Sequence, residues 1–258
     1  GGVVAAVSAS ASSSSAWTLL GVSGAAWAWG ASAVWLFPAT LAGFLINWLV
    51  IAPRLQHLAA RNGAITLTDV LATGPRGERY LTAARVASAI ILISFSFYVA
   101  AQFQEAGAAS DPQFGRGAGA AILVGAGFVL VYTLLGGFWA VSVTDTVQGL
   151  LMAVTAVVLP VAGLAALGGP AVLWGWLASD AAGGAFGGRA APAALGFVAG
   201  TLGIGLGYPG QPHVLNRFMA LKDRRALARA RAVAIAWAAV VYAGMLLTGW
   251  CARLLLTG

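Results

Sequence analysis

Few side chains in this sequence could perform chemistry, and one carboxylate among them stands inside an apolar stretch. That residue is Asp145, which follows Thr144 near an expected helix start. An ionisable group in apolar surroundings is costly, and it is a functional candidate for that reason. An aspartate near a helix start can instead accept hydrogen bonds from free backbone amides. Both interpretations of Asp145 stay open, a functional carboxylate and a helix cap.

Two other stretches combine polar side chains with residues that interrupt helices. The first carries serines at positions 8, 10, 12, 13, 14 and 15, followed by Ala16-Trp17. The second reads Gly207-Tyr208-Pro209-Gly210-Gln211-Pro212. Serine hydroxyls can bond the local backbone, prolines remove amide donors, and glycines lower the cost of unwinding. We predict a break in each of these helices, with close packing of small residues as the alternative.

Composition places the elements that carry these residues in a membrane. Of the 258 residues, 60% are hydrophobic and 8% are charged, whereas about 25% of the residues in soluble domains are charged. So few charges cannot cover a surface in water, which excludes a soluble enzyme, a disordered chain and a disulfide scaffold. The net charge of +7 does not indicate nucleic-acid binding, because the arginines separate apolar stretches instead of following one polar face.

Seven apolar segments are long enough to cross the hydrocarbon, which takes about 20 residues. They cover residues 3–27, 31–52, 82–105, 117–137, 140–167, 192–217 and 232–253. The loops after the second and sixth segments hold five and six basic residues, 11 of the 14 in the chain, with Arg217 counted in the second group. Positive charge marks the cytoplasmic side. We therefore predict a cytoplasmic N-terminus and an outside C-terminus for this chain.

The sequence predicts neither a transition-metal site nor an enzyme. His57 and His213 have no second histidine, cysteine or carboxylate at metal-ligand spacing. Catalysis within a bilayer would need an acid and base pair, and Asp145 has no partner visible in the sequence. We expect a structural role for His213. Cys251, the single cysteine, is expected to be a buried apolar residue.

The two interrupted segments lie five helices apart. Broken backbone at membrane depth is tolerated where it is buried in protein or lines a wet cavity. A pair of interrupted segments in corresponding positions is typical of inverted-repeat transporters, which bind their cargo near the middle of the membrane. The chain begins with Gly1-Gly2 and ends inside an apolar run, so we expect a piece of a larger protein of transporter size.

Five stretches give the chain a resemblance to a known family. They are Ala6–Ser12 through Trp17 to Gly24, Asn47-Trp48 with Ala52–Leu55, Ala64–Asp69, Tyr132–Ser142 with Thr144-Asp145 and Gln148, and Leu206–His213 with Arg217–Met219. On these residues the chain resembles the sodium/solute symporters, most closely their sodium/proline branch. The resemblance runs in order through nearly all 258 residues and covers part of the family's length.

The resemblance implies an all-α integral membrane fold with an inverted-repeat core of five plus five helices. This chain would form one incomplete transmembrane domain, 1–258, holding about seven core helices. The first repeat would cover about 3–167, and the second would begin in about 192–258. One extra first helix and core helices eight to ten would lie outside it.

The resemblance also implies half of a sodium site. Backbone carbonyls of Ala11 and Ser14, at the break in the first helix, match sodium ligands of the family. Asp145 matches an ion-path carboxylate, which favours the functional interpretation over the cap. The remaining sodium ligands of the family are hydroxyls on core helix eight, outside this chain.

For the solute, the resemblance implies a site beside the two breaks. The candidate residues are Ser13, Ser15, Trp17, Tyr98, Tyr208, Gln211 and Pro212. The aromatic ring at Tyr208 corresponds to a gate or stacking wall in the family. The proline branch usually carries aspartate where this chain has Ser13 and favours tryptophan where it has Ile204. These departures argue against a strict proline pocket.

The predicted function is sodium-coupled symport of a small organic solute by alternating access, with proline or a related amino or organic acid favoured. Sodium is the coupling ion, and no organic cofactor is implied. The solute and the lipid bilayer are the expected partners, without nucleic acid. The alternative is a truncated, non-transporting remnant or a solute-sensing module of the same family. A composition rich in Ala, Gly and Arg suggests a bacterial inner membrane.

Overall fold

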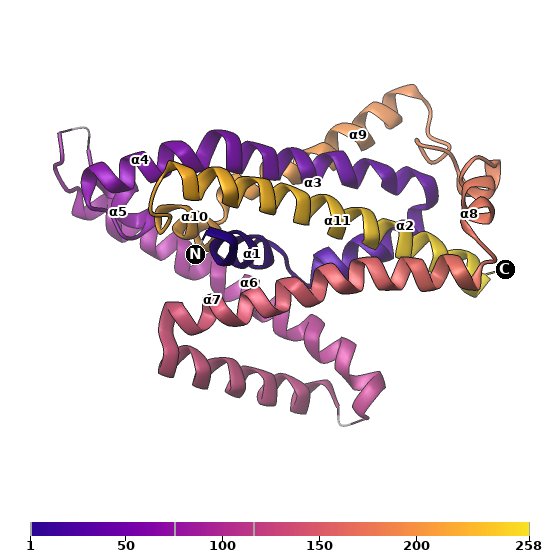
Figure 1. Ribbon diagram of the computed structural model, residues 1–258, viewed down its shortest axis with the longest axis horizontal. Helices are drawn as coiled ribbons and strands as arrows, with labels where there is room; N and C mark the ends of the chain where they lie inside the picture. Colours follow the sequence, from indigo (N-terminus) through magenta and orange to yellow (C-terminus); the bar gives the residue numbers. More distant parts are fainter. Residues whose placement is uncertain (1, 75, 116, 258) are drawn as a thin grey trace.

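The structure is a bundle of long helices with short helical connectors (Figure 1). The computed structural model describes residues 2–74, 76–115 and 117–257, which contain no named strand. The helices are α1 Gly2–Ser13, α2 Val22–Trp29, α3 Leu36–Leu45, α4 Ala52–Asn62, α5 Leu67–Ala72, α6 Leu81–Phe114, α7 Ala118–Ala166, α8 Pro170–Leu177, α9 Ala191–Leu206, α10 Pro212–Met219 and α11 Arg224–Thr257. Shorter 3-10 or π turns are η1 Trp17–Gly21, η2 Gly30–Trp35, η3 Ile46–Ile51, η4 Asp180–Ala182 and η5 Tyr208–Gly210.

Two long helical runs each fold back on themselves. The run Trp17–Asn62 has 46 residues and α7 has 49. At 1.5 Å per residue, each would extend about 70 Å, more than twice the hydrocarbon thickness of about 30 Å. The runs reverse at Gly30 (φ 63°) and Gly137 (φ 54°). Figure 1 shows the two arms of α7 folding back on each other. Divided at these two reversals, the five long apolar helices of the described residues give seven segments, and α1 adds the first part of the predicted crossing 3–27.

The buried core forms around α11, which contacts α7, α2, α1 and α3. Trp237, Tyr242 and Trp250 of α11 are buried. Small residues allow the helices to approach closely, because a Cβ at Gly244 would lie only 1.9 Å from the carbonyl oxygen of Ala156 in α7. Small residues at helix contacts are common in membrane proteins, where packing rather than the hydrophobic effect holds helices together.

The outer helices carry apolar side chains on their surface. Leu92 and Phe97 of α6 are 68% and 76% exposed, and Leu135 of α7 is 85% exposed. Such a surface is stable against lipid or further protein and costly in water. The described helices therefore form an all-α integral membrane protein.

Basic residues gather at one end of the bundle. This end, called the basic end here, carries α4, α5, α10 and the start of α11, while α8 and the C-terminus lie at the opposite end (Figure 1). Its basic residues include Arg54, Arg61, Arg79, Lys222 and Arg224. The basic loops that lie far apart in the sequence thus share one side, as the positive-inside rule requires of cytoplasmic loops.

The Ala64–Asp69 stretch forms a helix start at the basic end. The Thr66 hydroxyl accepts from the Asp69 amide at 3.2 Å, and the Thr66 amide donates to the Asp69 carboxylate at 3.0 Å. This reciprocal capping box begins α5. The hydrogen bonds from Thr66, more than the nearby Arg79, hold the pKa of Asp69 below its ordinary value.

Candidate functional site

The serine-rich stretch breaks its helix, which confirms the first predicted interruption. α1 ends at Ser13, and regular turns resume at Trp17. The Ser13 hydroxyl donates to the carbonyl oxygen of Ser10 at 2.7 Å, a local bond that competes with the helical ladder. The amide of Ala16 donates to Oε1 of Gln102 on α6 at 2.9 Å. A side chain from another helix thus satisfies backbone that the break would leave unpaired.

The second predicted break is also confirmed. α9 ends at Leu206, and Gln211 adopts extended backbone (φ −98°, ψ 95°) before Pro212 begins α10. Proline suits a first helical turn because its missing amide has no partner there. The carbonyl oxygen of Tyr208 accepts a hydrogen bond from Nδ2 of Asn47 at 3.1 Å. The Asn47 side chain of η3 therefore holds the unwound segment in place.

The two breaks face each other across a small cavity of about 170 Å³. Its wall consists of Ser13, Ser15, Trp17 and Thr18 from the first break and Ile204, Gly207, Tyr208 and Gln211 from the second. Five of the seven predicted solute residues line this one cavity. Pockets for drug-sized ligands measure about 300–1,000 Å³. This central cavity is therefore of a size for a small solute.

Gln211, which lines the central cavity, carries an unsatisfied polar atom. Its Oε1 is buried and has no hydrogen-bond partner among the described residues. A buried acceptor without a partner costs about 1–3 kcal/mol, so native proteins rarely keep one without a reason. A ligand that donates a hydrogen bond, such as an amine, would remove this cost.

Tyr98 and Pro212 line a second cavity beside the first. It measures about 340 Å³, lies between α6 and the second break, and shares Gln211 with the central cavity. The Tyr98 ring lies 5.7 Å from the ring of His213. Nε2 of His213 is 2.8 Å from the carbonyl oxygen of Ser12, in line with a structural histidine. The predicted solute residues are thus divided between two adjoining cavities, with Gln211 common to both.

Asp145 forms an ion pair with Arg217 inside the bundle, with side chains only 15% and 9% exposed. The carboxylate also accepts from the hydroxyl of Ser12 at 2.8 Å and from that of Ser8 at 3.3 Å. Nε of Arg217 donates to the Ser8 hydroxyl at 2.9 Å. The network joins α1, α7 and α10. Ser8 and Arg217 also line a cavity of about 420 Å³, together with Lys222.

This ion pair corrects two sequence interpretations. Asp145 caps no helix, because it lies within α7, eight residues after the reversal at Gly137. Arg217 is no loop residue, because it belongs to α10 and is 8% exposed. A lone buried charge is strongly destabilising, and each residue therefore accounts for the burial of the other. The sequence hides this pairing because 72 residues separate the partners.

The backbone predicted to bind sodium lies at the C-terminal end of α1. The carbonyl oxygen of Ala11 accepts from the Ser14 amide at 3.1 Å, and a carbonyl oxygen has a second lone pair to offer. α7 packs closely here, since a Cβ at Gly149 would lie 3.0 Å from that of Ala11. Asp145 is one helical turn before Gly149. Within the described chain, no three His, Cys, Asp or Glu side chains gather as they would around a transition metal.

Sequence reasoning misses Tyr242, which connects the two breaks. This tyrosine of α11 is 1% exposed. Its hydroxyl lies 3.3 Å from that of Thr18, and it also bonds the hydroxyl of Tyr208. One side chain from a third helix therefore bridges both broken segments. The only signal in the sequence is a phenol inside an otherwise apolar run, which is a weak one.

Comparisons with known proteins agree with this architecture. A family model described as the sodium:solute symporter family matches residues 1–257. The chain is 35% identical over 255 residues to the osmoregulated proline transporter OpuE of Bacillus subtilis (strain 168), covering 96% of this chain and 50% of that protein. It is 33% identical over 258 residues to the sodium/proline symporter of Staphylococcus aureus, covering 96% and 48%.

The chain spans about half the length of the curated relatives it matches. No solved structure matches it. The family match extends over almost every residue, and the described helices form a multi-pass membrane bundle with two interrupted crossings. On these grounds the chain belongs to the sodium:solute symporter family.

Proposed function

We propose that the protein containing this chain moves a small organic solute across the cell membrane together with sodium, by alternating access. The supporting observation is the central cavity of about 170 Å³ between two broken helices. Gln211 lines this cavity, and its buried Oε1 has no hydrogen-bond partner among the described residues. Proline or a related amino acid is the favoured solute, because two matched relatives are named as proline transporters.

The solute would be held by its amino group and by its apolar body. Oε1 of Gln211 and the hydroxyls of Ser13 and Ser15 offer hydrogen-bond acceptors to a primary or secondary ammonium group. The rings of Trp17 and Tyr208 form the apolar part of the same wall. Hydrogen bonds to a charged group are worth about 1.5–3 kcal/mol each, so Gln211 would contribute a large part of the affinity.

The second cavity would serve as the route by which solute reaches or leaves Gln211. Tyr98 and Pro212 line the second cavity, and Gln211 lines both this cavity and the central one. The Tyr98 ring packs on His213 at the break. Movement of α6 relative to the second break would open or close this route, which is the type of helix displacement that alternating access requires.

Sodium is the second cargo and would lie at the first break. Backbone carbonyls of Ala11 and Ser14 supply uncharged oxygen ligands, which suit a monovalent ion that must also leave. The remaining ligands would come from helices outside this chain. Asp145 would attract sodium along its path once its pair with Arg217 opens, since the carboxylate then lacks a counter-charge.

Uptake by the full-length protein in liposomes tests the proposal. We expect labelled proline to accumulate with an inward sodium gradient and not with an equal potassium gradient. Gln211→Leu should raise the KM for solute by about tenfold or more, because it removes the acceptor for the amino group. Gln104→Leu is the matched control, since Gln104 is exposed on α6 and lines neither cavity.

Two results would contradict the proposal. Uptake that proceeds equally without sodium would show that solute transport is not coupled to sodium. An unchanged KM in Gln211→Leu would show that the central cavity is not the solute site. The alternative, a non-transporting solute-binding module, predicts saturable solute binding by the purified protein with no accumulation under any ion gradient.

A further inference from the structure

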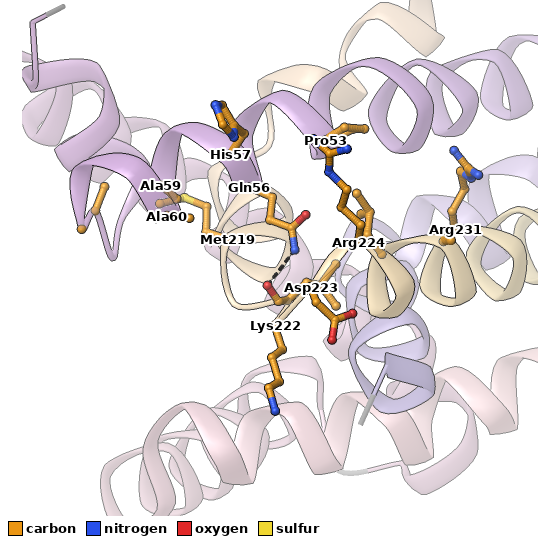
Figure 2. A pocket seen from close by; sticks show the side chains of 15 residues that line it. Pro53, Gln56, His57, Ala59, Ala60, Met219, Lys222, Asp223, Arg224 and Arg231 are labelled. Carbon is orange, nitrogen blue, oxygen red and sulfur yellow. Dashed lines mark hydrogen bonds between the residues drawn. The ribbon is translucent and has the colours of Figure 1, made fainter.

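A separate cavity of about 730 Å³ lies at the basic end, between α4, the α10–α11 connection and α11 (Figure 2). Two helix faces form its sides. α4 contributes Pro53, Gln56, His57 and Ala60, and α11 contributes Arg224, Leu227, Ala228 and Arg231. Each set follows the spacing i, i+3, i+4, i+7 of a single helix face. The cavity is thus a groove between two helix faces and shares no lining residue with the central cavity.

Small residues and one hydrogen bond keep this basic groove open. The lining includes small residues from both sides of the groove. They are Ala60, Gly63 and Ala64 at the end of α4 and after it, and Ala228 on α11. Nε2 of the buried Gln56 donates to the carbonyl oxygen of Leu221 at 2.8 Å, shown as the dashed line in Figure 2. This bond fixes α4 against the connection that precedes α11.

The groove carries net positive charge, because Lys222, Arg224 and Arg231 line it together with a single carboxylate, that of Asp223. In Figure 2, Arg224 reaches from α11 toward Pro53, whereas Lys222 and Asp223, which also line the groove, point away from Pro53. The Asp223 carboxylate is occupied as a helix cap, accepting from the Ala226 amide at 2.7 Å, and this bond lowers its pKa.

No arginine of the groove is among the ion pairs of the described residues, which are Arg79–Asp69 and Arg217–Asp145. Arg224 and Arg231 stand seven residues apart on one face of α11, about 10 Å along the helix. Two guanidinium groups at this spacing can flank one phosphate-bearing headgroup, because arginine binds phosphate oxygens through paired N–H donors.

The surroundings of the groove favour a lipid over a soluble anion. α4 is the last part of the apolar run Trp17–Asn62, and α11 continues into the membrane from the groove. Val50 and Leu58, beside the groove on the same helical run, are 40% and 41% exposed. A headgroup in the groove would therefore have an apolar surface beside it for its acyl chains, at the side where basic residues meet anionic lipid.

We propose that this groove binds the headgroup of an anionic phospholipid, with Arg224 and Arg231 as its phosphate ligands. The phosphodiester would lie between the two arginines, and the small residues of α4 and α11 would make room for it. Binding here would link α4 to α11 at the basic end. This site is independent of the transport that we propose above, because it can be measured as lipid binding alone.

Spin-labelled phosphatidylglycerol tests the site on the full-length protein reconstituted in phosphatidylcholine vesicles. We expect a motionally restricted lipid population that Arg224→Gln/Arg231→Gln weakens by about tenfold or more, given the strength of arginine contacts to anionic headgroups. Arg225→Gln/Arg229→Gln is the matched control, with the same loss of charge at exposed positions of α11 outside the groove. It should change the restricted population little.

A second variant separates the groove from a general charge effect. Ala228→Leu keeps every charge and fills the space, and we expect it to displace the lipid as well. Equal losses in both arginine pairs, or full binding in Ala228→Leu, would overturn the site and leave only surface attraction. Displacement of the spin label by millimolar inorganic phosphate would overturn the lipid assignment in favour of a soluble anion.

Discussion

Asp145 and Arg217 illustrate how single residues acquire their meaning in this protein. Each is a charged side chain in a bilayer-spanning bundle, and each would be costly alone. Together with the hydroxyls of Ser8 and Ser12 they form a closed network between α1, α7 and α10. The network lies directly beside the first break, so a change in its charges should reach both stability and ion coupling.

Removing one charge of this pair should be far more costly than removing one from a surface pair. We expect Arg217→Gln to lower the free energy of unfolding by about 3 kcal/mol, because it leaves a buried carboxylate unpaired. Arg79→Gln is the control, since its pair with Asp69 is 65% and 27% exposed and should be worth less than about 1 kcal/mol. Denaturant unfolding in detergent micelles measures both.

The double variant Asp145→Asn/Arg217→Gln checks the reason for that loss. It leaves no unpaired charge, so much of the lost stability should return. A double variant as unstable as the sum of its parts would show that the two side chains do not act as a pair.

Tyr242 should matter through its hydroxyl alone. Tyr242→Phe keeps the ring in the core and removes the bonds to Thr18 and Tyr208, at a cost of about 1 kcal/mol in stability. Because these bonds hold both breaks, we expect the KM for solute to rise as well. Tyr132→Phe, on the first arm of α7, should leave both quantities unchanged. Thermal unfolding and solute uptake are the measurements, and equal effects of the two variants would contradict the bridging role.

At the scale of elements, the second broken helix depends on a close contact made by a glycine. Gly205 of α9 packs on α3, where a Cβ would lie 2.2 Å from the carbonyl oxygen of Ala39. The same helix ends one residue later, at Leu206, before the break. The position of the second break is therefore set by how closely α9 can approach α3.

A pair of alanine variants on α9 tests this contact. Gly205→Ala must push α9 from α3, and we expect a loss of about 1–3 kcal/mol in unfolding free energy together with reduced uptake. Gly203→Ala, two residues away, meets nothing within 4 Å and should stabilise the helix by up to about 1 kcal/mol. The opposite order of stabilities, measured by thermal unfolding, would rule out the α3–α9 contact.

For the whole molecule, the distribution of charge makes a prediction about orientation. The basic end should face the cytoplasm, and the α8 side should face outward. We expect a cysteine at Asn62 to react with a membrane-impermeant maleimide only in inside-out vesicles, and one at Ala185 only in right-side-out vesicles. The native Cys251 is buried and should stay unlabelled. Labelling of both positions from the same side would refute this orientation.

The sequence determined much of this protein because local composition carries the information for membrane crossings and breaks. Apolar runs of sufficient length predict the seven crossings, and the serine cluster and the Tyr208–Pro212 stretch predict both interruptions. Five predicted solute residues meet in one cavity for the same reason, since each lies at a break. The roles of Ala11 and Ser14 as sodium ligands stay predictions.

Only the tertiary structure decided which distant side chains meet. The partner of Asp145, the bridging role of Tyr242 and the basic groove all arise from contacts between helices that are far apart in the chain. An isolated apolar helix shows in its sequence that it enters the membrane but not which face meets which neighbour, because lipid and protein neighbours are equally apolar. Packing of small residues chooses the neighbour, and that choice exists only in three dimensions.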